Sequence, residues 1–216
     1  KGRHIADFTN EYLLPAIEEC NSQMSPNAPE WFCILGNDDP RSEEEAFIKA
    51  DQNGILHYTH ARPTSFGEYT VLGYSFVPPS PFLLKDWEKY DVSRYADPGC
   101  IHPTEGHRSV PPDYDTEYST IKKDLEELTH NMDTSKLLLL FHSPPYNSSL
   151  DRAALDGKMI DHVPLDVHVG SIAIRDFLVE KQAPLSLHGH IHESTRLTSC
   201  WKEKFGSCLA INGAND

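Results

Sequence analysis

Three short apolar runs, each followed at once by polar residues, constrain this fold more than any other feature of the chain. Residues 31–35 run into Gly-Asn-Asp-Asp, residues 137–141 run into His142, and residues 184–187 run into His-Gly-His-Ile-His. Apolar runs of this length, bounded by turn residues, are typical of buried strands. Open α/β sheets place their sites at the carboxyl ends of strands. We therefore expect three neighbouring core strands whose polar ends converge.

The remaining pattern predicts an α/β protein whose strands are covered on both faces by amphipathic helices. Pro15 predicts a kink in the first helix. The expected helices cover residues 6–20, 42–51, 121–128 and 174–178, and further strands cover residues 55–60, 69–76 and 205–211.

Two long segments, 78–115 and 143–168, carry no such periodicity and are rich in Pro and Asp. Long irregular segments inside a compact domain are uncommon and often functional. We interpret both as loops that shape a substrate pocket. Four side chains of or beside the second loop are candidates to line it: Tyr146, Asn147, His162 and His168.

Length and charge narrow the classes of partner. A chain of 216 residues fits one domain, and no apolar run approaches the 18 residues of a transmembrane helix. The formal net charge of −14 argues against nucleic-acid and anionic-membrane partners, and it favours divalent cations. Five scattered cysteines without a C-x-x-C pair favour reduced thiols and a cytoplasmic location.

The polar clusters suit metal binding, although each has a plainer reading. His190 and His192 alternate, so in an extended segment both would point to one face, with Gly189 giving the backbone room. Alone, such a pair can simply be exposed. Asn37, with the carboxylates after it, offers oxygen ligands for a hard or borderline cation, but Gly-Asn-Asp-Asp-Pro is also a favourable turn sequence. His142 follows four leucines and a phenylalanine, where a histidine is buried unless it faces a site.

Taken together and in this order, the clusters resemble the last three motifs of the calcineurin-like metallophosphoesterase family, G-N-H-[DE], a lone His after a strand, and G-H-x-H. The matching residues are Gly36-Asn37-Asp38-Asp39, His142 and Gly189-His190-Ile191-His192. The resemblance extends over essentially the whole chain, residues 1–216, as one metallophosphoesterase domain. It implies a four-layer α/β/β/α sandwich of two mixed sheets.

The family resemblance also implies a mechanism and a ligand set. Asn37, His142 and His190 would bind one divalent metal and His192 a second, with Mn favoured among Mn, Fe, Zn, Ni and Co. A hydroxide bridging the metals would hydrolyse a small phosphomonoester or phosphodiester. Asp38 and Asp39 would stand at the position of the family's catalytic His and the acid that orients it.

Two departures from the family pattern qualify this expectation. The family's upstream D-x-H and G-D-x-x-D motifs are absent from the chain, and we expect them in a segment preceding Lys1. Asp38 replaces the family's His, and an ionised carboxylate neither donates a proton nor attracts phosphate. These departures favour the rival interpretation, a catalytically weak or inactive binding scaffold on the same fold. A structural zinc domain is disfavoured, because its ligands would be Cys-rich and close in sequence.

Overall fold

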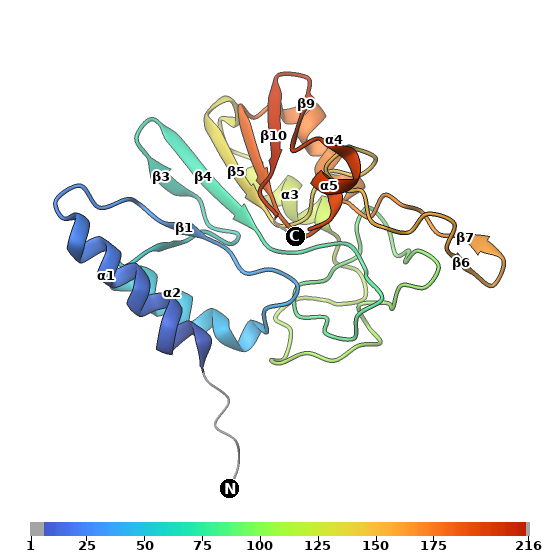
Figure 1. Cartoon of the computed structure of the whole chain (residues 1–216), viewed down its shortest axis with the longest axis horizontal. Coiled ribbons are helices and arrows are strands. Elements are labelled where there is room, and N and C mark those ends of the chain that lie inside the picture. The colour runs from blue at the N-terminus through green and yellow to red at the C-terminus, as the bar shows by residue number, and fades with distance from the viewer. Residues whose placement is uncertain (1–6, 215–216) are drawn as a thin grey trace, which may run out of the picture.

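The computed structural model describes residues 7–214 and is built on a six-stranded mixed sheet (Figure 1). Its strand order is β3-β4-β5-β8-β10-β9. The four inner strands run parallel, and the two edge strands are antiparallel to their neighbours. The α/β class is therefore confirmed. The strands are β3 (Thr64–Phe66), β4 (Tyr69–Tyr74), β5 (Leu137–Phe141), β8 (Leu185–His188), β9 (Lys202–Phe205) and β10 (Cys208–Asn212).

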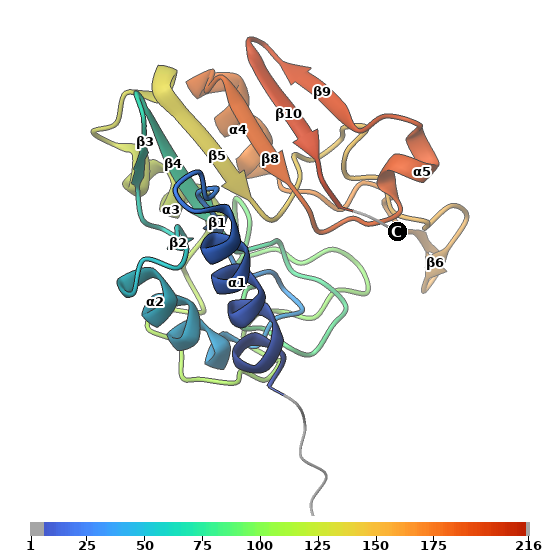
Figure 2. The same ribbon diagram turned by 60° about the vertical axis from the view of Figure 1, so that its left-hand side comes forward.

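Two helices, α3 (Ile121–Thr129) and α4 (Ile172–Lys181), cover one face of this sheet (Figure 2). Each begins at a hydroxyl residue, Thr120 or Ser171, whose side chain accepts a hydrogen bond from the first turn of the helix. The Phe141 ring of β5 lies 6.0 Å from the Phe177 ring of α4. This helical face carries the sealed part of the hydrophobic core.

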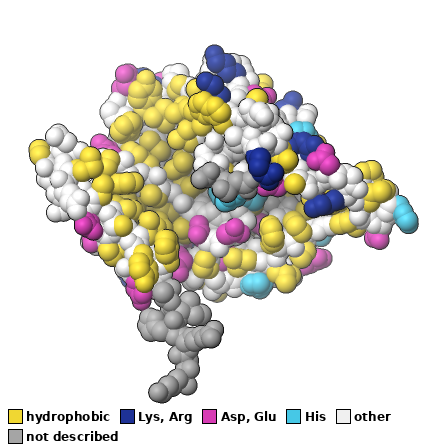
Figure 3. All heavy atoms as spheres, viewed as in Figure 1, with side chains coloured by type: hydrophobic (Ala, Val, Ile, Leu, Met, Phe, Trp, Pro, Cys, Tyr) yellow, Lys and Arg dark blue, Asp and Glu magenta, His cyan; other side chains and the backbone are white. Residues whose placement is uncertain are grey.

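The opposite face of the sheet is only half covered. Along β5 and β10 buried residues alternate with partly exposed ones, and in β8 Leu187 is 38% exposed. Side chains that alternate in this way point to opposite faces of the sheet. Figure 3 shows hydrophobic side chains gathered over β4, β5 and the strands beside them. The prediction that the strands are covered on both faces is therefore wrong for residues 7–214.

The N-terminal part packs on β4 and shares one hydrophobic core with the large sheet. A π-helical turn (Thr9–Leu13) leads without a break into α1 (Leu14–Met24), so Pro15, where a kink was predicted, lies at the change from π- to α-helix. A two-stranded parallel sheet, β1 (Phe32–Cys33) with β2 (His57–Tyr58), and α2 (Glu44–Gln52) follow.

The segment after β1 meets the larger sheet at Gly73, where an added Cβ would lie 2.4 Å from Ile34 Cγ2. β5 and β8 are neighbours in the large sheet, but β1 is not part of it. The expectation of three neighbouring core strands is therefore wrong for residues 31–35. Within this apolar run only β1 is a strand, it belongs to another sheet, and Ile34 after it packs on Gly73 of β4.

The remaining elements show where the sequence pattern is weak. Residues 78–115 contain no helix or strand, as predicted, and the strand expected at 69–76 ends at Tyr74. The second long loop, by contrast, contains the small hairpin β6 (Met159–Ile160) and β7 (Val163–Pro164). Strands β3 and β9 and the short helix α5 (Ser194–Thr198) were not predicted. The strand expected at 205–211 is in fact the end of β9, a turn at Gly206 with φ +64°, and most of β10. Between residues 7 and 214 no helix has the length and apolarity needed to cross a membrane.

Candidate metal centre

The side-chain oxygen of Asn37 is the point where the three polar clusters meet. His142 Nε2 lies 2.8 Å from Asn37 Oδ1, and His190 Nδ1 lies 2.7 Å from the same oxygen. The two imidazole ring centroids are 5.1 Å apart. Asn37 reaches this point from the turn after β1, whereas His142 and His190 come from the carboxyl ends of β5 and β8. Three of the four predicted metal ligands therefore converge.

Both imidazoles are held neutral. An amide oxygen only accepts hydrogen bonds, so His142 Nε2 and His190 Nδ1 each donate a proton to it. Burial, and then the proximity of His192, lowers the pKa of His142 to about 4. Burial, and then His142 and His192, lowers the pKa of His190 to about 3. Neutral imidazole is the form that binds metal ions, once the proton moves to the other ring nitrogen.

The backbone at His190 differs from the extended segment expected there. β8 ends at His188, and His190 has φ +68°, so the chain bends instead of continuing as a strand. A non-glycine residue in this left-handed region is uncommon and often marks a functional site. His192 is exposed and lies close enough to the other two imidazoles to lower the pKa of both.

Asp38 and Asp39 have different positions in the turn after β1. The Asp39 carboxylate accepts the Gly36 backbone N–H at 2.7 Å, and the Asp39 N–H donates to the Gly36 carbonyl at 3.1 Å. Burial raises the pKa of Asp39, the Gly36 bond opposes this, and the like charges of Asp38 and Glu43 add to the rise. Asp38 is exposed and accepts a 3.2 Å hydrogen bond from the Asn37 amide. Asp39 therefore closes the turn that presents Asn37, a positioning role, and catalysis by either residue stays a prediction.

The donor set fits one divalent metal through mixed N and O ligands. Two donors that each bind one metal at about 2.1 Å can lie at most about 4.2 Å apart, and both distances to Asn37 Oδ1 are well inside that limit. Among residues 7–214 no three His, Cys, Asp or Glu side chains gather to hold a metal ion, so the set depends on the Asn37 amide. A second metal would need ligands beyond His192.

The backbone of Gly36 lies so close to His142 that only glycine fits. A Cβ at Gly36 would lie 2.6 Å from His142 Cε1, whereas a Cβ at Gly189 would lie at an ordinary 3.5 Å from His142 Nδ1. The sequence interpretation assigned the close approach to Gly189, and the structure assigns it to Gly36.

Replacing Gly36 by Ala should therefore push the His142 ring off Asn37. We expect Gly36→Ala to weaken metal affinity at least about tenfold, the lower range for displacing a ligand's supporting contacts. Gly189→Ala is the matched control and should bind metal as the unmodified chain does. Isothermal titration with Mn²⁺ or Zn²⁺ gives both affinities, and equal affinities would contradict the close packing of Gly36 on His142.

Two further histidines, His60 and His188, link stability to pH. Burial is the main cause that lowers the pKa of His60 to about 3 and that of His188 to about 4. In the unfolded chain both have the ordinary value of about 6.5, so between pH 6.5 and 4 the unfolded state binds more protons. The contribution of these two neutral histidines to the free energy of unfolding is therefore complete above pH 6.5, and it is lost as the pH falls below that value.

We expect the melting temperature to be on the order of 5–10 °C lower at pH 5 than at pH 7. Differential scanning fluorimetry across this range measures it. In the double variant His60→Gln/His188→Gln the melting temperature should fall less between pH 7 and pH 5 than in the unmodified chain. A decline that is unchanged in the variant would show that other groups cause it.

Comparison with known proteins shows likeness of fold alone. No protein-family model and no curated protein matches the sequence. One solved crystal structure, 15% identical, superposes with a TM-score of 0.52 over 96% of this chain and 66% of its own. The crystal structure of TT1561 of Thermus thermophilus is 12% identical, with a TM-score of 0.45, over 85% of this chain and 62% of its own. The chain therefore spans less than two thirds of the length of either structure.

Proposed function

We propose that this chain is the larger part of a calcineurin-like metallophosphoesterase domain that hydrolyses a small phosphomonoester or phosphodiester. The observation that carries the proposal is the convergence of His142 and His190 on Asn37 Oδ1. The three residues follow strands of two different sheets, and Asn37 and His190 are 153 positions apart along the chain. Neither a plain turn at Asn37 nor an exposed pair of histidines would explain why these side chains meet.

Divalent metal bound here would lower the pKa of a water molecule and offset negative charge on phosphate. The chain's own residues supply the rest. One donor atom each comes from His142, His190 and Asn37. Because the pKa values of the two histidines are low, both imidazoles are neutral at pH 7 and need not release a proton to solvent before they bind metal. His192 is the proposed ligand of a second metal, whose other ligands would come from outside residues 7–214.

The open face of the sheet supports the finer fold, a four-layer sandwich. Its partly exposed side chains include Leu138, Leu140 and Leu187, and a groove of about 370 Å³ lies between Leu140 and the α1 region at Phe8 and Leu13. Exposed apolar faces of this extent mark surfaces that another element covers. We propose that a second sheet, extending β1 and β2, packs on this face and brings further metal ligands to the site.

The direct test is metal-dependent turnover. The full chain loaded with Mn²⁺ is assayed on p-nitrophenyl phosphate and bis-p-nitrophenyl phosphate, with EDTA-treated protein as the blank. We expect Mn²⁺-dependent release of p-nitrophenol that His142→Ala removes. A chain that binds Mn²⁺ but releases no product from either ester would instead be the binding scaffold, which the Asp38 substitution favours.

A further inference from the structure

The two long loops enclose an apolar cavity that is separate from the metal centre. Its volume is about 160 Å³, and none of the four predicted metal ligands lines it. The first loop contributes prolines to the wall, and the second loop with the residues just after it contributes aliphatic side chains. The apolar wall includes Pro79, Pro81, Leu155, Ile160, Leu165 and Val169. Since an apolar cavity of about 150 Å³ holds one benzene ring, this cavity is large enough for a ligand with a single ring.

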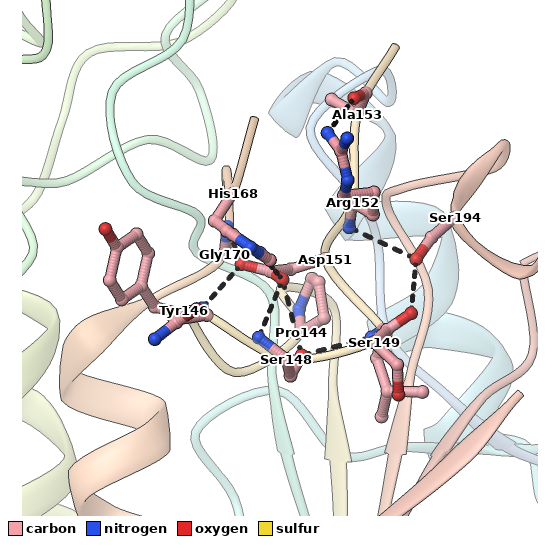
Figure 4. A network of polar contacts seen from close by, with 12 residues as sticks. Pro144, Tyr146, Ser148, Ser149, Asp151, Arg152, Ala153, His168, Gly170 and Ser194 are labelled. Carbon is pink, nitrogen blue, oxygen red and sulfur yellow. Dashed lines mark hydrogen bonds and ion pairs between the residues drawn. The ribbon is translucent and has the colours of Figure 1, made fainter. Parts of the chain in front are cut away.

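His168 lines this cavity in a fixed orientation. Its Nδ1–H donates to the carboxylate of Asp151 at 2.8 Å (Figure 4). Asp151 is fully buried, and at 2.9, 3.0 and 3.1 Å the same carboxylate accepts three backbone N–H groups, those of Asn147, Ser148 and Gly170. With its proton on Nδ1, the neutral imidazole only accepts a hydrogen bond at Nε2. His168 therefore offers an acceptor to a ligand in the cavity.

Two carboxylates stand at the open side of the cavity. Asp97 and Asp166 both line it, and both are exposed. Asp166 accepts the Tyr146 hydroxyl at 2.6 Å and the His168 backbone N–H at 2.9 Å. Partial burial raises the pKa of Asp166, but these two bonds outweigh it and hold the pKa below its ordinary value. The Asp166 carboxylate is therefore ionised at neutral pH.

The second carboxylate, Asp97, has no partner for its charge. Its side chain makes no hydrogen bond or ion pair with any residue between 7 and 214. Partial burial, and then the like charge of Asp166, raises the pKa of Asp97. Asp166 also lies close enough to His168 for the two charges to interact, so the three acceptors are near one another. No lysine or arginine of the described chain lines the cavity, and the matching ligand is therefore a positively charged donor.

We propose that this cavity binds a small organic cation, an aromatic ring joined to a primary ammonium group. The ring packs against the prolines and aliphatic side chains of the wall, and the ammonium donates to Asp97, Asp166 and His168 Nε2. An ammonium has three N–H donors, which matches these three acceptors. The formal net charge of −14 favours the approach of a cation. The site goes beyond the proposed hydrolysis and does not depend on it, because it needs neither a metal ion nor a phosphate.

The charge of the ligand tests this assignment. Benzylammonium, benzyl alcohol and benzoate share one ring and differ in charge. Each is titrated into the metal-free full chain by nuclear magnetic resonance, with the backbone amide signals of Gly99 and Gly170 in the cavity wall as reporters. We expect benzylammonium to shift both signals, benzyl alcohol to bind at least about tenfold more weakly, and benzoate not to bind. Equal affinities for benzylammonium and benzyl alcohol, or no shift with benzylammonium, would overturn the proposal.

The substitution Asp97→Asn tests the unpartnered carboxylate. It should weaken benzylammonium binding at least about tenfold and leave benzyl alcohol binding unchanged, because only the ammonium uses the charge. The matched control is Asp161→Asn, which removes the same charge from an exposed hairpin position with φ +46°, a conformation that Asn tolerates. Equal losses in the two variants would show a general effect of net charge and would contradict a cation site at Asp97.

Filling the cavity tests the place of the ring. Leu165→Trp puts a large side chain into the wall and should abolish the binding of benzylammonium and of benzyl alcohol. The control is Val163→Trp, at an exposed position in the hairpin, which should bind both ligands as the unmodified chain does. The melting temperature of each variant shows that it is folded. Benzylammonium binding that persists in a folded Leu165→Trp chain would place the ligand elsewhere and overturn the proposal.

Discussion

Replacing His190 by Ala is expected to lower metal affinity by at least about 100-fold and to remove metal-dependent hydrolysis. The bonded set has three donors, and loss of one leaves Asn37 and His142, too few to complete a metal shell. The backbone of His190 has φ +68°, and this bend directs the imidazole toward Asn37. Isothermal titration and inductively coupled plasma mass spectrometry of dialysed protein measure affinity and stoichiometry.

The control for this loss is His130→Ala, an exposed histidine just after α3. It should bind metal as the unmodified chain does. A metal affinity in His190→Ala equal to that of the control would place the metal elsewhere. Because removal of a buried side chain can also lower stability, His190→Asn, which retains a polar group of similar reach, should fold with a similar melting temperature and still bind metal more weakly.

Replacing Leu139 by Ala is expected to lower the free energy of unfolding by about 2–5 kcal/mol. Leu139 lies at the middle of β5, is 1% exposed and points to the face that α3 and α4 cover. Its truncation leaves a cavity that the sheet cannot close. For a chain of this length the melting temperature should fall on the order of 5–15 °C.

The matched variant is Leu187→Ala on the open face of the neighbouring strand β8, where the side chain is 38% exposed. It should lower the free energy of unfolding by no more than about 0.5–1 kcal/mol. Urea titrations give both values. Equal losses would show that the open face is sealed in solution, by a second copy or by another part of the chain.

The sequence predicted the site better than it predicted the sheets. The limits of β5 follow directly from Leu137–Phe141, because an unbroken apolar run of this short length between polar residues favours a buried strand over a helix. The site was predicted from Asn37, His142 and His190 together, because polar residues directly after buried strands are typical of functional sites in α/β proteins. The sequence did not predict that β1 lies in a different sheet from β5 and β8. Local periodicity identifies a strand but does not show which distant strand it pairs with.

Elements with little apolar content were missed. β9, with the sequence Lys-Glu-Lys-Phe, pairs with β10 through its backbone while most of its side chains face solvent. The turn at His190 was missed because positive φ is expected of Gly189 beside it. His168 was predicted only as a side chain that could line the pocket, and its 2.8 Å contact with Asp151 was missed because the two residues are 17 positions apart in an irregular loop.

We expect a metal ion to take the place of the two hydrogen bonds that His142 and His190 donate to Asn37 Oδ1. Anomalous diffraction from crystals soaked in Mn²⁺ or Zn²⁺, recorded at the metal edge, tests it directly. We expect a peak at about 2.0–2.2 Å from Asn37 Oδ1, His142 Nε2 and His190 Nδ1. A peak elsewhere, or no peak with both imidazoles still bonded to the Asn37 oxygen, would contradict it.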